Sequence, residues 1–249
     1  MSQVVGERVD YVQGGGGNTS VKLPGGLMAI KASGFRLSQV TASDGFAVVE
    51  TATLRDVTAE QGYKPLRPSV EAAFHALLGT FVLHTHPVYT NLALCAEHGG
   101  AKIAAALAGL PYITVPYINP GPELAEVIRA RLQPETRIVL LENHGLVVTG
   151  DTADACLALH EEVNTRLAAA YGVTPADFDR LFDELGKTLY PDQQVYLTLT
   201  AAQTEILAAV VFIHNTLAQN GDTARPMTAS AQNFIAGWES EAYRKSVLS

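Results

Sequence analysis

The stretch FVLHTHP, residues 81–87, joins an apolar, β-prone run to two histidines that stand two positions apart. Side chains alternate between the two faces of a β-strand, so the spacing predicts that His84 and His86 project from the same face. Pro87 then ends the strand, because proline has no N–H to donate to a sheet ladder. Two ordinary polar residues would give the same pattern, so the pair alone does not separate a structural role from a functional one.

His144 supplies a third imidazole from a distant part of the chain. It follows the apolar run RIVLL, residues 137–141, and precedes Gly145, which permits a tight turn. Three neutral imidazoles are enough to hold a catalytic Zn²⁺ while one coordination position stays open for substrate. The three segments together therefore favour a metal site made by His84, His86 and His144.

The segment RPSVEAAFH, residues 67–75, contributes a carboxylate. Glu71 lies near the start of an expected helix, where the helix dipole also favours an exposed carboxylate of no special function. The functional alternative is a general base beside a metal-polarised carbonyl. His75 lies one turn further along, and we expect it to be structural because three histidines already supply the ligands.

The composition is typical of a globular enzyme, with 47% hydrophobic and 17% charged residues in a chain of 249. A formal net charge of −8 argues against nucleic acid or an anionic membrane as partner, since phosphates need clustered Lys and Arg. Cys95 and Cys156 lie in helix-like surroundings and are interpreted as small buried hydrophobes. A signal peptide and an unbroken run of roughly 18 apolar residues are both missing, so we expect a cytoplasmic protein.

Strand and helix patterns mix without strict alternation, which predicts a largely antiparallel sheet covered by helices. A hairpin is expected around Val21 and residues 27–31, because Pro24, Gly25 and Gly26 between them favour a turn. The other predicted strands are residues 46–50, 81–86, 112–117, 137–141, 145–150 and 195–200. The predicted helices are residues 69–78, 151–171, 174–186, 204–219 and 230–245. We expect one domain over 1–249, with the motifs in 1–172 and a helical extension over 173–249.

The segment GGGGNTS, residues 14–20, could hold an anion, because successive glycine N–H groups can point into one concavity. It lacks the GK[ST] of a Walker A loop, and no clear strand precedes it as in a dinucleotide fingerprint. A plain flexible loop explains it equally well. Tyr117, in VPYINPG, lies among turn residues, where a structural tyrosine is the default interpretation.

Taken together, the segments GGGGNTS, KASG, RPSVE, HTHP, VPYINPG and NHG resemble the class II aldolase/adducin family in their order. The resemblance spans about residues 12–171. It is closest to the aldolase half of fused rhamnulose-1-phosphate aldolase/alcohol dehydrogenase proteins. The resemblance implies a three-layer α/β/α fold with a central, largely antiparallel sheet. It also implies a homotetramer with active sites between subunits, and a Zn²⁺ cofactor for which Mn²⁺ or Co²⁺ could substitute.

The resemblance also assigns roles to residues. The metal ligands become His84, His86 and His144, the base becomes Glu71, and the acid, which a neighbouring subunit supplies in the family, becomes Tyr117. The phosphate contacts become Gly17, Asn18, Ser33, Gly34 and Ser69. Val70 stands where sugar-phosphate aldolases of the family often carry a second serine, which removes one donor to the phosphate.

The expected activity is therefore cleavage of a ketose 1-phosphate, or a related hydroxy-carbonyl compound, to dihydroxyacetone phosphate and an aldehyde. Epimerisation, decarboxylation or dehydration on the same scaffold are the alternatives within the family. An interaction protein of the adducin kind is the alternative of another class, but such members lose the metal ligands that this chain retains.

Overall fold

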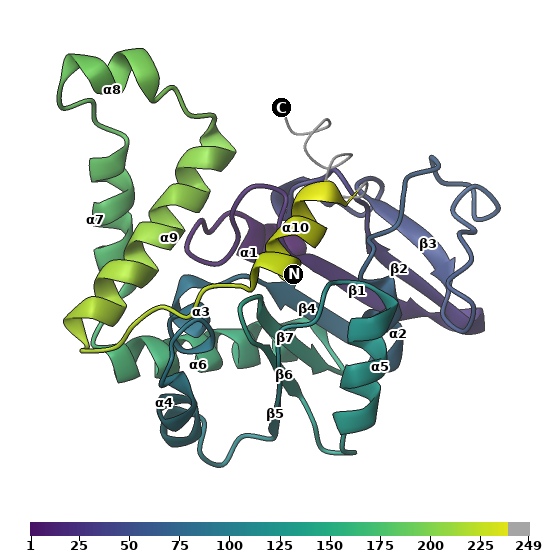
Figure 1. Ribbon diagram of the computed structural model, residues 1–249. Helices are drawn as coiled ribbons and strands as arrows, with labels where there is room; N and C mark the ends of the chain where they lie inside the picture. The colour runs from purple at the N-terminus through teal and green to yellow at the C-terminus, as the bar shows by residue number, and fades with distance from the viewer. Residues whose placement is uncertain (239–249) are drawn as a thin grey trace.

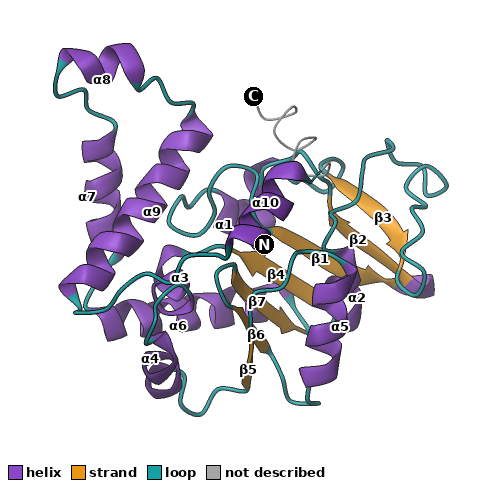
Figure 2. Ribbon diagram, in the orientation of Figure 1, coloured by secondary structure: helices purple, strands orange, loops and turns teal. Residues whose placement is uncertain are grey.

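The computed structural model describes residues 1–238 and builds them around one seven-stranded mixed sheet (Figures 1 and 2). The strands are β1 (Asn18–Leu23), β2 (Leu27–Lys31), β3 (Phe46–Glu50), β4 (Phe81–Thr85), β5 (Tyr112–Val115), β6 (Ile138–Leu141) and β7 (Gly145–Gly150). Their order across the sheet is β3-β2-β1-β4-β7-β6-β5. All neighbours are antiparallel except β5 and β6, which confirms the predicted, largely antiparallel sheet.

Helices cover both faces of this sheet and complete three layers, as expected (Figure 1). On one face, α2 (Ala72–Leu77) and α5 (Pro122–Arg131) bury a core that includes Phe74, Val82 and Ile128. On the other face lie α3 (Val88–Leu94), α4 (Gly99–Ala106) and α6 (Ala153–Tyr171). Successive strand residues therefore enter different cores: Val82 packs beneath α2, whereas Leu83 packs beneath α3 and α6.

The remaining helices lie at the two ends of the chain. They are α1 (Ser2–Gly6), α7 (Pro175–Leu185), α8 (Pro191–Tyr196), α9 (Ala201–Gln219) and α10 (Ala229–Gly237), with short 3₁₀ turns at Pro24–Gly26 and Leu37–Gln39. Figure 1 shows α7 and α9 side by side, with α8 across their far end. The predicted cap of α7 is present, because the Asp177 carboxylate accepts a hydrogen bond from the Thr174 backbone N–H at 2.9 Å.

Local turn chemistry explains the two hairpins that were predicted. Gly25 and Gly26 both adopt positive φ angles, 76° and 75°, between β1 and β2. The return from β6 to β7 is equally tight, and its turn includes Asn143 with φ of 52°. Both turns therefore match the sequence-based expectation.

Two expectations about secondary structure are corrected. The helix predicted from Ser69 begins at Ala72, because the Ser69 hydroxyl is used in a turn and accepts the Glu71 N–H at 3.3 Å. The predicted strand over 195–200 is wrong: α8 ends at Tyr196, and the following residues lead into the Thr200 cap of α9. A strand needs a partner, and here the chain lies outside the sheet. The last predicted helix is confirmed for α10, and residues 239–249 lie outside the described part of the chain.

Within residues 1–238, one helix, α9, has the length and mean hydropathy of a membrane span. Polar residues interrupt the sequence of α9, so this helix contains no unbroken apolar run of that length. In this helix, 33% of the most apolar 18-residue stretch is buried inside the protein. Phe212 in this helix makes edge-to-face contacts with Tyr89 and Phe178, at 6.2 and 5.4 Å between ring centroids. Core helices can have the same length and mean hydropathy, so these two properties of α9 are weak evidence for a membrane span.

Candidate metal centre and active site

Three imidazoles converge at the end of β4. His84 lies in the strand, His86 follows it, and His144 lies in the turn between β6 and β7. One ring nitrogen of each lies within 4.8 Å of those of the other two, and the Nε2 atoms of His84 and His86 are 3.2 Å apart. The strand ends one residue before His86, so the convergence owes more to the turn after β4 than to the strict alternation expected.

Hydrogen bonding and close packing fix these rings. The Nδ1 of His84 lies 3.0 Å from the Leu146 carbonyl oxygen and donates to it, which leaves the Nε2 lone pair directed at the cluster. Two glycines let the backbone pass beside His86. A Cβ on Gly16 would lie 2.9 Å from the His86 Nδ1, and one on Gly145 would lie 2.3 Å from the Thr85 carbonyl oxygen. A side chain at Gly145 would need a backbone shift and one at Gly16 would displace the His86 ring, so both glycines are part of the site.

The donor set fits a divalent transition metal. Ligands about 2.05 Å from a tetrahedral ion stand roughly 3.3 Å from one another, and the His84–His86 pair has this spacing within 0.1 Å. The Glu71 carboxylate lies beside the cluster, with oxygens 3.5 Å from the His84 Nε2 and 3.3 Å from the His144 Nε2. Nitrogen donors of this kind suit Zn²⁺ and its first-row neighbours better than Mg²⁺ or Ca²⁺.

Glu71 is buried and held in one orientation. It is the residue that precedes α2, and its Oε2 accepts a hydrogen bond from the Asn18 amide at 2.6 Å. Burial raises the pKa of the carboxyl, but His84 and His144 together with the Asn18 hydrogen bond lower it more, to about 2. The group is therefore a carboxylate at neutral pH.

A chain of hydrogen bonds behind Glu71 sets the orientation of Asn18. The β1–β4 register places Asn18 directly opposite His84, so both side chains emerge on the same face of the sheet. The Asn18 Oδ1 accepts from the His75 Nε2, and the His75 Nδ1 accepts from the Ser20 hydroxyl at 2.8 Å. Burial holds the pKa of His75 well below its usual range, so this ring is neutral. His75 thus lies behind the site as a hydrogen-bonding residue, in keeping with the structural role expected.

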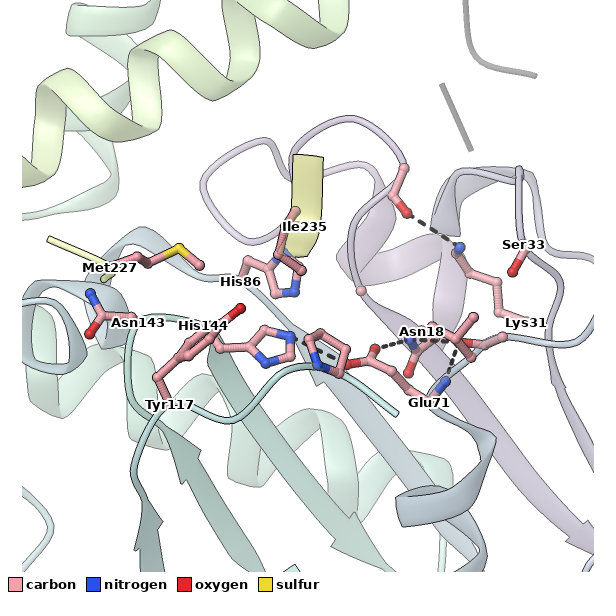
Figure 3. Close-up of a pocket in the computed structure, with 15 residues that line it drawn as sticks. Asn18, Lys31, Ser33, Glu71, His86, Tyr117, Asn143, His144, Met227 and Ile235 are labelled. Carbon is pink, nitrogen blue, oxygen red and sulfur yellow. Dashed lines mark hydrogen bonds and ion pairs between the residues drawn. The ribbon is translucent and has the colours of Figure 1, made fainter. Parts of the chain in front are cut away.

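A cavity of about 240 Å³ opens beside the carboxylate and the histidines (Figure 3). Four of the five predicted phosphate contacts line it; Gly34 does not, although its neighbour Ser33 does. Asn18 faces Glu71 and Ser69 with its amide nitrogen, which makes it a support for Glu71 more than a donor to an anion. Tyr117 lines the cavity of its own chain, so a phenol reaches the site within one subunit.

The cavity also contains residues other than the predicted site residues. Lys31 is 4% exposed, and its ammonium lies 3.4 Å from the Gly15 carbonyl oxygen in the glycine-rich loop. Val70 lines the same cavity, so the missing hydroxyl of that position would indeed face a ligand. Met227 and Ile235 reach it from the C-terminal segment (Figure 3). Lys31 adjoins the KASG motif, but no sequence signal links Met227 or Ile235 to the site.

Comparison with known proteins agrees with this geometry. Residues 5–171 match the family of the class II aldolase and adducin N-terminal domain. A curated relative, the "Uncharacterized oxidoreductase YuxG" of Bacillus subtilis, is 38% identical over 93 residues. That match covers 36% of this chain but only 13% of the relative, so this chain matches a small part of a longer protein.

Two solved structures share the fold. The N-terminal class II aldolase domain of a conserved protein from Thermoplasma acidophilum superposes with a TM-score of 0.57 at 26% identity, covering 68% of this chain and 89% of that one. YgbL from Klebsiella pneumoniae, whose name gives aldolase, epimerase and decarboxylase as candidate activities, superposes with a TM-score of 0.52 at 23% identity. It covers 83% of this chain and 99% of its own. Sequence, fold and site together show that the chain belongs to the class II aldolase and adducin family.

Proposed function

We propose that this protein is a metal-dependent aldolase that cleaves a ketose 1-phosphate, or a related hydroxy-carbonyl compound, to dihydroxyacetone phosphate and an aldehyde. The observation that carries the proposal is the convergence of three imidazoles and one buried carboxylate on a cavity whose far side holds Lys31, Ser33 and Ser69. An interaction module has no use for such a set of groups, and membership of the family supports an enzyme.

The anion of the substrate would lie on the side of Lys31 and the glycine-rich loop. Ser33 and Ser69 offer hydroxyl groups there. Gly17, with a positive φ of 64°, has no side chain of its own that would shield its backbone N–H. Lys31 adds a cation to these neutral donors. A point charge of this kind still lacks the bidentate geometry of an arginine clamp.

His84, His86 and His144 would hold a divalent cation, which as a Lewis acid would stabilise negative charge on the carbonyl oxygen of the substrate. In the direction of synthesis, Glu71 removes a proton from the hydroxymethyl carbon of dihydroxyacetone phosphate. The carbon then attacks the aldehyde, and Tyr117 donates its proton to the aldehyde oxygen as the carbon–carbon bond forms. After synthesis, the proton that Glu71 took up leaves to solvent and a proton from solvent restores the Tyr117 phenol; cleavage follows the same steps in reverse.

Hydrogen exchange tests this proposal without knowledge of the aldehyde. The metal-loaded protein should exchange one hydrogen of the hydroxymethyl carbon of dihydroxyacetone phosphate with D₂O, as followed by ¹H NMR, and chelation should stop the exchange. A panel of ketose 1-phosphates then identifies the substrate by release of dihydroxyacetone phosphate. If neither exchange nor release occurs, or if the only product is an epimer, a decarboxylated compound or a dehydrated one, the aldolase proposal is wrong.

A further inference from the structure

A second cavity, of about 710 Å³, meets the first one at the metal centre. Four residues line both cavities, namely Gly15, His86, Asn143 and His144. The first cavity extends from them toward Lys31, and the second extends toward α9, which Figure 1 shows on the opposite side of the glycine-rich loop from β2. A substrate that contacts the three histidines therefore has room on two sides. We call the second space the α9 cavity.

One wall of the α9 cavity is apolar. Ala202, Ile206, Ala209, Val210 and Ile213 line it from α9, at spacings that place them on one face of the helix. Ile206 and Val210 remain 51% and 46% exposed, so they present carbon surface to the space. An aliphatic chain in this position would bury apolar surface against these five side chains, while Thr200 and Gln203, which also line the cavity, are polar.

One polar atom in this cavity is unmatched. Asn91 is 9% exposed and lines the cavity, and its amide nitrogen donates to the His144 carbonyl oxygen at 3.3 Å. That hydrogen bond fixes the orientation of the amide, because a flipped amide would place the Asn91 Oδ1 against the His144 carbonyl oxygen. The Oδ1 atom is buried and accepts no hydrogen bond from the described residues. A buried acceptor without a partner is unfavourable, and a hydroxyl group of a ligand can supply the missing donor.

We propose that the α9 cavity binds the aldehyde half of the substrate, and that this half is an aliphatic chain of several carbons with a hydroxyl near the metal centre. Asn91 accepts the hydrogen bond of that hydroxyl, and Ile206 and Val210 pack against the chain beyond it. The inference rests on the proposed aldolase function and adds the chemical class of the second product. The apolar wall lies in α9, outside residues 5–171, which match the family.

Aldol addition to dihydroxyacetone phosphate tests the wall by chain length. With acetaldehyde, butanal and hexanal as acceptors, kcat/KM of the wild type should rise by up to about fourfold for each added methylene. The Ile206→Thr/Val210→Thr double variant should lose most of this rise. Val211→Thr, the same Val-to-Thr change at a position of α9 that does not line the cavity, should keep it. A wild type without the rise, or a double variant that retains it, would overturn the proposal.

Two further readouts separate this inference from the proposed function. Hydrogen exchange into dihydroxyacetone phosphate needs no aldehyde. If exchange occurs but kcat/KM of aldol addition does not depend on the chain length of the aldehyde, the proposal for the α9 cavity is refuted and the proposed function is not. Saturation-transfer NMR with 1-hexanol needs no turnover at all. The alcohol should bind to the wild type and to Val211→Thr but not to the double variant, and hexyl methyl ether, which cannot donate to Asn91, should bind more weakly. Equal binding of 1-hexanol to all three proteins would contradict the proposal even if the enzyme has another activity.

Discussion

At the scale of single residues, the site depends on buried hydrogen bonds that hold the candidate ligands and the candidate base in one orientation. The Leu146 carbonyl fixes the tautomer of His84, and Asn18, itself held by His75, fixes the Glu71 carboxylate. Each support is buried, so water does not compete for these hydrogen bonds. The sequence proposed candidates for the reacting residues but not this arrangement. Asn18 was assigned to the phosphate and Ser20 looks like an ordinary strand residue until the register sets them beside His84 and His75.

Replacement of Glu71 by Gln should reduce turnover by about 100-fold or more, the usual range for a general acid–base group. Glutamine has the same shape and can keep its contact with Asn18, but it cannot accept the proton. Steady-state cleavage and hydrogen exchange into dihydroxyacetone phosphate should fall together, while bound metal is retained. An active Glu71→Gln enzyme would mean that the base is another residue.

The anion side of the cavity makes a different prediction for Ser33→Ala and Ser69→Ala. Each change removes one hydroxyl donor to a charged group, which corresponds to about 1.5 kcal/mol, or roughly tenfold in affinity. KM should therefore rise more than kcat falls, because the phosphate is bound equally in the ground and transition states. Ser43→Ala, at an exposed position outside the cavity, is the control. An unphosphorylated ketose that is cleaved as well as its 1-phosphate would refute the assignment of this side to phosphate.

At the scale of secondary structure elements, the strands and turns with local signals were predictable. The two hairpins have glycine or asparagine where positive φ is needed, and the capping residues of α7 are explicit in the sequence. The stretch 195–200 has an equally β-prone sequence, but strand formation depends on a partner that only the complete fold determines. The contribution of α9 to the site was likewise unpredictable, since Ile206 and Gly14 are distant in sequence and meet only in the folded chain.

Glu205 is the clearest case of such a long-range contact. This buried residue of α9 accepts the Gly14 N–H at 2.6 Å and the Arg36 guanidinium at 2.9 and 3.0 Å, so it ties the glycine-rich loop to the segment after β2. Glu205→Ala leaves Arg36 without this partner and the Gly14 N–H unsatisfied. Because Arg36 is partly exposed, we expect the free energy of unfolding to fall by about 2 kcal/mol, below the value for a fully buried pair.

Urea denaturation measures this difference. Glu162→Ala breaks an exposed pair with Arg166 within α6 and should cost less than about 0.5 kcal/mol, which makes it the matched control. Equal decreases in the free energy of unfolding of the two variants would show that the contact of Glu205 with the glycine-rich loop stabilises the protein no more than an exposed ion pair does.

At the scale of the whole molecule, the three-layer fold brings groups from both halves of the chain to one end of β4. The family resemblance predicted the layers and the histidines, but not the cover that the C-terminal segment provides through Met227 and Ile235. We propose that the protein assembles as a homotetramer, as the resemblance implies. Sedimentation velocity should give a single species of four chains, and a monomer with full activity would contradict it.

The central claim is that His84, His86 and His144 bind a catalytic metal ion, and elemental analysis of the purified protein tests it most directly. We predict about one equivalent of Zn²⁺ or another first-row divalent ion per chain, less than roughly one tenth of that in His144→Ala, and an unchanged circular dichroism spectrum. His98→Ala, which removes an exposed histidine outside the cluster, should bind as much metal as the wild type. Full occupancy in His144→Ala would contradict the account.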